Sequence, residues 1–437
     1  MCPAAPVAHI ELEARALLVR LNQIRPFALT LPMVMGAAPS QAAWSAIENY
    51  LATNRARLRR DCQRFIRWLR GPGRAAPPHD LQRRLAFLRL LVLSGINRFD
   101  IFADALAMRS QHGIGQWLGG LDIAAADALE FPPGVPVEAP PIVCYLDRGH
   151  GAAIRRARTR LPGGGDNPAA IIQVPWERMV GSAISGSLIH EVGHQAAALL
   201  ELVPALRLRL DAVARRGGPD RVAWDCFRRW ISEIVADLWA VAHLGIGATV
   251  SLIGVVSLPR PFVFRTSLED PHPFPWIRVL ISAAFGRRLF PHSQWDDLER
   301  LWERLYPLGG LDPVRMRLYL TIRRTIPAFV DLVCRHRPRL LSGRSLLEIL
   351  PLADRQPQRL RALYSQWRRR EDGMAAARPT LALAVIGQAK FDGRLSAEDE
   401  SRLIGRLLRY WAYRGSVDTA AMCLEARRKQ HAVARAV

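Results

Sequence analysis

A proline-rich stretch at residues 130–141 is the sequence feature that most limits how this chain can fold. It reads EFPPGVPVEAPP, with five prolines in twelve residues. Proline removes a backbone donor and restricts the residue before it, so neither a helix nor a central strand can continue through the stretch. Residues 9 to about 130 carry several segments of helical period. We therefore predict a helical N-terminal domain over residues 1–135.

The region after this stretch combines short strand candidates with helical segments. PIVCYLD at 141–147 and AAIIQVP at 169–175 have the residue types of buried strands and flank a turn-rich loop. The helical patterns beyond them lie at 176–202, at 225–245 and from about 280 to 437, with a break near 335–345.

These patterns predict a fold that is mainly α (α+β), with a small β-sheet. We expect a central domain at 136–335 and a helical C-terminal domain at 336–437. The apolar run at 234–258 contains Asp237 and His243 and is interrupted by glycines. A polar-interrupted run of this kind predicts buried core helices rather than a membrane span.

The net charge of +22 has two interpretations. Almost all of the positive charge is arginine, since Lys390 and Lys429 are the only lysines. The skew fits a GC-rich coding sequence whose arginines cover solvated helix faces, or a surface that contacts a polyanion such as nucleic acid. No nucleic-acid-binding motif accompanies the arginines, and nothing in the sequence indicates an oligomeric state.

The cysteines and the N-terminus bear on the compartment. The six cysteines are scattered and form no CxxC pair, which is typical of reduced thiols. The first residues lack the basic start and apolar run of a signal peptide. We expect a cytoplasmic protein.

The stretch IHEVGHQAAALL at 189–200 carries the clearest chemical signal. On a helix, His190 and His194 lie one turn apart on the same face and can direct two imidazoles at one point. Zinc accepts such neutral imidazoles, and Glu191 is rotated away from them, so it can act on a zinc-bound water. Alternatively, the histidines are an ordinary pair satisfied by hydrogen bonds on a buried helix.

A third ligand would decide between these interpretations, and SEIVADLWA at 232–240 supplies a candidate. Glu233 and Asp237 lie on one face of an otherwise apolar helix. Glu233 would complete a His2Glu zinc site with an open position for water, and Asp237 would accept the spare N–H of a ligating histidine. The alternative is an ion pair of these acids with Arg228 or Arg229.

Together, these segments resemble the gluzincin zinc metallopeptidases, the group that includes thermolysin. SEIVADLWA is most similar to the E-x-x-A-D helix of the HtpX-type peptidases. DPHPFPWIRV at 270–279 resembles their H-P-P-x-x-x-R-I segment, because His272 and Arg278 keep the spacing of its histidine and arginine. Phe274 replaces the second proline, and the family's membrane helices have no counterpart. The resemblance covers roughly residues 169–280 and implies a zincin-like catalytic core.

The same resemblance places His272 or Arg278 at the cleft, as catalytic groups that stabilise the oxyanion formed when water attacks a carbonyl. Alternatively, the His-Pro pair forms a rigid turn and Arg278 pairs with an acid structurally. In zincins the strand before the motif helix commonly pairs with an extended substrate, which implies that role for residues 169–175.

The function predicted from these residues is a zinc-dependent metallopeptidase that acts on a peptide or protein substrate. His190, His194 and Glu233 would bind Zn²⁺, and Glu191 would be the general base. The alternative is a non-hydrolytic protein that keeps a zincin fold as a binding or regulatory module and engages nucleic acid through its arginines.

Overall fold

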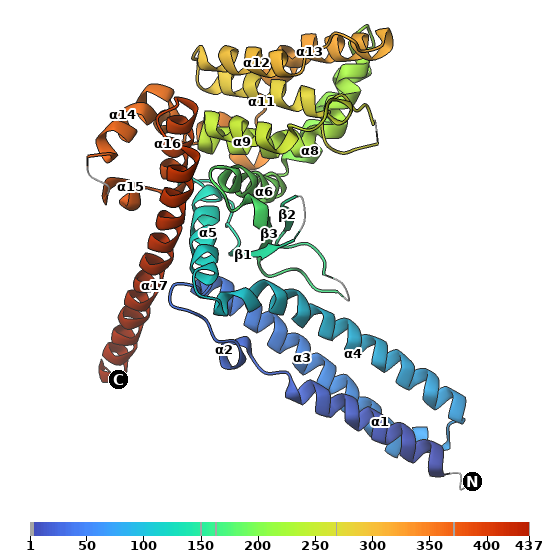
Figure 1. Cartoon of the computed structure of the whole chain (residues 1–437). Coiled ribbons are helices and arrows are strands. Elements are labelled where there is room, and N and C mark those ends of the chain that lie inside the picture. Colours follow the sequence, from blue (N-terminus) through green and yellow to red (C-terminus); the bar gives the residue numbers. More distant parts are fainter. Residues whose placement is uncertain (1–3, 149–150, 162–163, 268, 370–371, 437) are drawn as a thin grey trace.

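The computed structural model describes residues 4–148, 151–161, 164–267, 269–369 and 372–436. Over these residues the chain is mainly helical, with one three-stranded mixed sheet, which confirms the predicted fold class at that level. Figure 1 shows three parts: a helical arm that carries the N-terminus, a central sheet, and a larger body of helices around it.

The arm consists of three long helices and a short one. They are α1 (Ala4–Gln23), α2 (Phe27–Thr30), α3 (Gln41–Arg70) and α4 (Pro78–Ala107). The long helices pack along one another through residues at helical spacing, such as Leu58 on α3 and Leu85 on α4, which are both buried. They form a small core of their own.

The sheet lies between the base of the arm and the helical body. Its strands are β1 (Ile142–Asp147), β2 (Ala153–Arg155) and β3 (Ala170–Pro175), in the order β1-β3-β2. β1 and β3 are parallel and β2 is antiparallel to β3. These spans confirm the two predicted strands, whereas β2 was not predicted.

Successive residues of β1 and β3 point to opposite faces of the sheet and therefore join different buried clusters. Val143 and Ile171 join buried residues at the base of α3 and α4. Cys144 and Ile172 join the main core on the opposite face, which α5 (Ile114–Ala128) and α6 (Ala183–Leu199) cover. β1 and β3 are thus buried on both faces, consistent with their almost continuously apolar sequences, whereas β2 is partly exposed.

The remaining α-helices pack around the main core. They are α7 (Leu202–Ala214), α8 (Arg221–Leu244), α9 (Ile246–Val256), α10 (Arg260–Val263), α11 (Pro275–Leu289), α12 (Gln294–Leu305), α13 (Pro313–Cys334), α14 (Pro357–Trp367), α15 (Asp372–Ala376), α16 (Pro379–Phe391) and α17 (Ala397–Ala436). Helix α17 packs along α5, and α8 packs against both α6 and α7 (Figure 1).

One continuous core joins these helices. It runs from Leu118 on α5 to Trp411 on α17. The packing therefore crosses the positions 135/136 and 335/336 at which the sequence suggested domain boundaries.

The single helix predicted over residues 176–202 is wrong at both ends. A 3-10 turn occupies Trp176–Arg178, and Gly181 has a φ of 63°, so α6 begins only at Ala183. At the other end α6 stops at Leu199, and Glu201 adopts a left-handed conformation before α7. Pro204 then lies in the first turn of α7, where its missing N–H leaves no helical hydrogen bond unmade.

The apolar run at 234–258 forms the end of α8 and all of α9, as the sequence indicated. Among the described helices, none combines the length and apolarity that crossing a bilayer needs. His243, at the end of α8, is a buried core residue whose Nδ1 lies 2.9 Å from the Trp239 carbonyl oxygen.

Candidate metal centre

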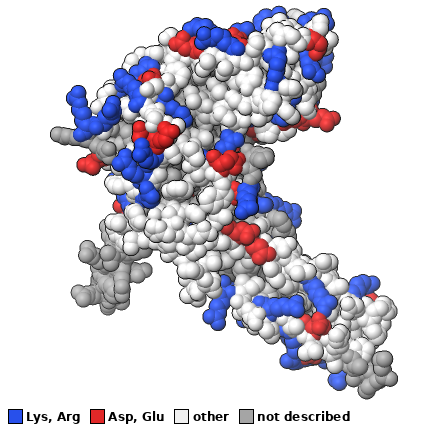
Figure 2. Space-filling view, viewed as in Figure 1, with Lys and Arg blue, Asp and Glu red and all other residues white. Residues whose placement is uncertain are grey.

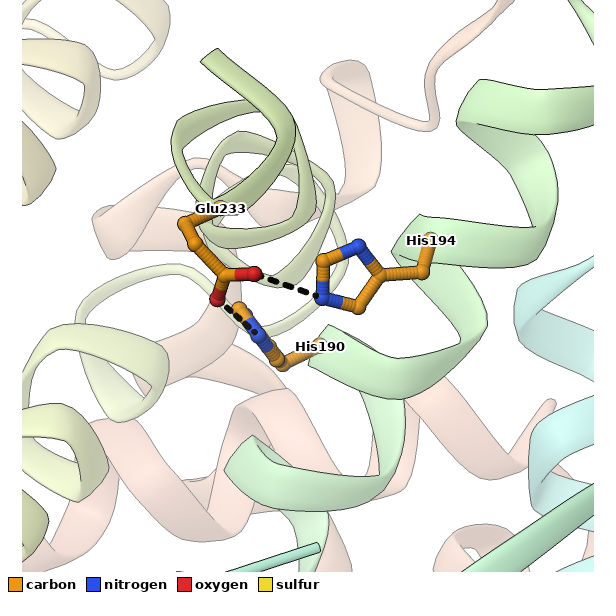
Figure 3. A group of neighbouring side chains, drawn as sticks. All are labelled: His190, His194 and Glu233. Carbon is orange, nitrogen blue, oxygen red and sulfur yellow. Dashed lines mark ion pairs between the residues drawn. The ribbon is translucent and has the colours of Figure 1, made fainter. Parts of the chain in front are cut away.

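Three potential ligands from two helices converge at one point. His190 and His194 lie one turn apart on α6, and Glu233 reaches them from α8 (Figure 3). The Nε2 atom of His190 is 3.3 Å from one carboxylate oxygen of Glu233, and the Nε2 atom of His194 is 3.4 Å from the other. All three ligand atoms lie within 4.8 Å of one another, so this group could hold a metal ion.

The distances and donor types fit a tetrahedral metal. Ligands bound to zinc at about 2.0–2.1 Å in tetrahedral geometry lie about 3.3–3.4 Å apart, close to both histidine–glutamate separations. Two imidazoles and a carboxylate are also donors that zinc accepts.

The protonation states of His194 and Glu233 are those that metal binding requires. Burial and the neighbouring His190 lower the pKa of His194 to about 4, so its imidazole is neutral at neutral pH. Burial alone would raise the pKa of Glu233, but the contacts with the two histidines and the charge of Arg278 lower it to about 2. A neutral imidazole and an ionised carboxylate are the forms that bind a metal.

His190 differs because it touches a second acid. Burial alone would lower its pKa, but the Asp237 carboxylate outweighs that effect and raises it to about 9. The Nδ1 atom of His190 lies 2.8 Å from Asp237 Oδ1, although the pair is not aligned as a hydrogen bond. A metal bound at Nε2 would therefore displace a proton, and Asp237 is close enough to orient the ring.

Arg278 on α11 holds Asp237 in place. Its Nε and an Nη donate to the two Asp237 oxygens at 2.7 and 2.9 Å, a bidentate pair. The same guanidinium lies 3.6 Å from Glu233. Arg278 therefore lies beside the metal centre, as the family resemblance implied. It also forms an ion pair with Asp237, as the alternative interpretation implied.

The alternative ion pairs considered for the two acids do not form. Arg228 pairs with Asp211 instead, at 3.2 Å. Glu233 and Asp237 contact the histidines and Arg278. This arrangement explains why two carboxylates can be buried on an otherwise apolar helix, since each has charged or polar partners.

A glycine that the sequence reasoning missed lets the two helices meet. Gly193 lies between the motif histidines, and a Cβ at this position would come within 2.8 Å of the Ala236 Cα and 2.9 Å of the Trp239 Cβ. Because α6 and α8 approach so closely there, Glu233 can reach both histidines. The available signal was a glycine in the middle of a predicted helix, which costs stability unless close packing requires it.

The predicted general base, Glu191, lines a cavity of about 590 Å³ beside the three ligands. The residue is only 7 % exposed, and burial raises the pKa of its carboxyl above the usual value. Leu252 and Val255 of α9 form part of an apolar wall of the same cavity. The arrangement places a carboxyl of raised pKa at a cavity that the three potential ligands also line.

His272 lies at this cavity and is half-exposed. Its Nε2 atom is 3.5 Å from Glu233 Oε2, and its Nδ1 atom is 2.8 Å from Asp270 Oδ1. Asp270 in turn pairs with Arg265 at 2.8 Å. The His-Pro segment leads directly into α11, which begins at Pro275, so the histidine is held at a helix entrance facing the centre.

The strand expected to pair with substrate is not available for pairing. β3, at Ala170–Pro175, is the middle strand, and its two edges are taken by β1 and β2. The sequence reasoning failed here because β2 has only three residues, too few to show an alternating pattern. It is β2 that borders the cavity, through Ile154. His150, which lies in the glycine-flanked sequence DRGHGAA and which we interpret as structural, is outside the described residues.

No protein-family model, curated protein or solved structure matches this chain. What can be inferred about its function rests on its own residues and their geometry.

Proposed function

We propose that this chain is a zinc-dependent metallopeptidase of the gluzincin type. One observation carries the proposal: two imidazoles and a carboxylate lie close enough together to hold a metal ion, beside the buried Glu191 at an open cavity. Structural zinc sites usually have four protein ligands, whereas three ligands with an accessible fourth position are typical of catalytic ones.

Each residue of the metal centre has a separate role. His190, His194 and Glu233 would hold the ion, and Asp237 would orient His190 from behind. Zinc held in this way supplies a Lewis acid that polarises a carbonyl and makes water more acidic. Glu191 accepts a proton from the attacking water and passes it to the leaving amine.

The cavity also suits a peptide. Its walls combine the apolar side chains of α9 with the polar groups of α6 and α8. The edge strand β2, which borders it, can offer backbone groups to an extended chain. His272 is placed to donate a hydrogen bond to an oxyanion.

Two further observations concern the compartment and the basic charge of the protein. The described cysteines Cys62, Cys144, Cys226 and Cys334 are buried and unpaired, which supports a reducing, cytoplasmic location. On the face in Figure 2, basic and acidic side chains are interspersed rather than gathered in one basic surface. That distribution gives little support to the alternative of a nucleic-acid-binding module.

Glu191→Gln tests the proposal directly. The amide cannot act as a base, so we expect peptide hydrolysis to fall by about 10²-fold or more, while about one zinc per chain is retained. Hydrolysis of a peptide library and metal content by elemental analysis are the measurements. Glu398→Gln, at an exposed glutamate of α17, is the matched control and should change neither. Full activity in Glu191→Gln, or no zinc in the purified wild-type protein, would contradict the proposal.

A further inference from the structure

Several arginines line the cavity beside the metal centre. Arg156, directly after β2, is one of them, and Arg178, at the end of the 3-10 turn Trp176–Arg178, is another. The carboxylates in the described lining are Glu191, Glu233 and Asp237. All three belong to the metal centre, so the described lining holds no further carboxylate that could pair with Arg156.

The backbone that carries Arg156 is fixed by two buried amides. Asn167 Nδ2 donates to the carbonyl oxygens of Arg155 and Arg156, both at 3.1 Å. The N–H of Ala157 donates to Gln195 Oε1 at 2.8 Å. Asn167 and Gln195 are each 1 % exposed, so they hold this segment firmly.

Gln195 also ties this segment to the metal centre, because it directly follows His194 on α6. Arg156 therefore starts from a backbone position that is set relative to the ligand helix. A rigid anchor of this kind reduces the entropy lost when a side chain binds a partner.

The Arg156 side chain has no acidic partner among the described residues and is exposed. The other arginines of the lining differ in this respect: Arg178 lies 4.0 Å from Glu177, Arg265 pairs with Asp270, and Arg278 pairs with Asp237. A guanidinium presents a planar set of donors that matches a carboxylate in bidentate geometry. Arg156 is thus an available carboxylate-binding group at a cavity that the proposed chemistry uses.

We propose that the substrates are peptides that carry a carboxylate near the cleaved bond, and that Arg156 binds this carboxylate. The carboxylate is that of an aspartate or glutamate side chain, or the C-terminal carboxylate of the substrate. This inference rests on the proposed peptidase function. It makes Arg156 a specificity-determining residue, distinct from the residues that bind metal or move protons.

Kinetics on matched peptides test the inference in the zinc-loaded protein. A library in which each position is varied identifies a cleaved sequence, which is then made with Glu or Gln at the preferred acidic position, and with a free or amidated C-terminus. We expect kcat/KM to be about tenfold higher for a carboxylate-bearing peptide than for its amide counterpart, as for a charge-assisted bidentate contact. The position whose amidation removes the preference identifies the source of the carboxylate.

Variants at Arg156 provide a second test. Arg156→Gln should lower kcat/KM about tenfold for the carboxylate peptide, mainly through KM, and leave the amide peptide unchanged. Arg156→Lys should restore part of the preference. Arg155→Gln is the matched control, because Arg155 is the neighbouring exposed arginine of β2 but does not line this cavity. Equal losses on both peptides, or no preference in the wild-type protein, would overturn the inference.

A binding measurement separates this inference from the peptidase proposal. Immobilised Glu191→Gln protein retains library peptides, and the composition of the retained pool is read by mass spectrometry. Enrichment of carboxylate-bearing peptides that is lost in the Glu191→Gln/Arg156→Gln double variant supports the inference, even if the wild-type protein cleaves nothing. Absence of enrichment overturns it, even if the wild-type protein is an active peptidase.

Discussion

At the scale of single residues, the metal centre depends on a glycine, which has no side chain. Gly193 makes no side-chain contact and binds no ligand, but its hydrogen in place of a Cβ sets how closely α6 approaches α8. The distances between the histidines and Glu233 follow from that approach. A site built across two helices is therefore sensitive to one methyl group at their contact.

Gly193→Ala should disturb the protein and its metal together. The added methyl group would meet the Ala236 backbone and the Trp239 Cβ, so we expect a loss of about 1–3 kcal/mol in the free energy of unfolding, as for other overpacked contacts. Zinc affinity should fall at least tenfold as Glu233 moves away. Urea denaturation and competition with a chromophoric chelator measure the two effects.

The control for this prediction is Gly254→Ala. Gly254 lies in α9, and a methyl group added there would have open space around it, so alanine should keep or slightly raise stability and leave zinc binding unchanged. If Gly193→Ala behaved like Gly254→Ala, the close helix approach would not be what positions the ligands.

His243 is a second residue whose burial has a measurable consequence. Burial lowers its pKa to about 4, so the folded protein keeps it neutral, whereas the unfolded chain protonates it near its ordinary value of about 6.5. The unfolded state then binds more protons between these two values. Its contribution to stability is complete above about pH 6.5 and is lost as the pH falls towards 4.

His243→Asn should remove that pH dependence and keep a donor towards the Trp239 carbonyl. We expect the stability difference between wild type and variant to shrink by up to about 3 kcal/mol from pH 7 to pH 4, measured by urea denaturation at each pH. A difference that stays constant over this range would show that His243 is not held neutral.

At the scale of elements, α6, the helix that carries His190 and His194, is capped by a residue of the C-terminal helix α17. Glu400 on α17 accepts a hydrogen bond from the Ser182 N–H at 2.9 Å, just before α6 begins, and pairs with Lys390 of α16 at 2.7 Å. Glu400 is 1 % exposed. A negative group at a helix N-terminus stabilises it, so the C-terminal helices support the helix that carries the histidines.

Glu400→Gln should weaken this support. The amide loses the charge that interacts with Lys390 and the helix end, so we expect a loss of about 1–3 kcal/mol in the free energy of unfolding. Hydrogen exchange should also rise in the first turn of α6. Glu398→Gln, on the same turn of α17 but exposed, is the control. Unchanged exchange in α6 would argue against the cap.

These elements show how far the sequence could lead. Periodicity and residue types were enough to predict a mainly helical chain, two strands, and the placement of His190 and His194 on one helix face, because each depends on residues close in the sequence. Adding Glu233 to the two histidines rested on a second motif, SEIVADLWA, and on the pairing of such motifs in zinc sites. The start of α6 was not predictable in this way, since the Glu400 side chain that caps it lies 218 residues along the chain from Ser182. The place of β3 in the sheet likewise depends on a partner strand too short to recognise.

At the scale of the whole molecule, the described residues form three buried hydrophobic clusters. Leu85 and its neighbours form the core of the arm, whereas Leu238 belongs to the main core that includes α6 and α8. The base of the arm meets the sheet through a third cluster. Because the arm core shares no residue with the main core, the arm can lose stability without opening the metal centre.

Leu85→Ala and Leu238→Ala should therefore have different effects. Each removes a fully packed side chain and should cost about 2–5 kcal/mol locally. We expect Leu85→Ala to increase hydrogen exchange in α1, α3 and α4 with full zinc content. Leu238→Ala, beside Asp237, should lower zinc content as well as stability. Loss of zinc in Leu85→Ala would mean that the arm and the metal centre unfold as one unit.

The arm also governs how the molecule moves through solution. Helices α3 and α4 each have 30 residues, so each extends about 45 Å, and Figure 1 shows them projecting away from the helical body. A particle of this outline experiences more friction than a sphere of equal mass. It sediments more slowly and tumbles anisotropically, and a globular calibration of gel filtration would overstate its mass.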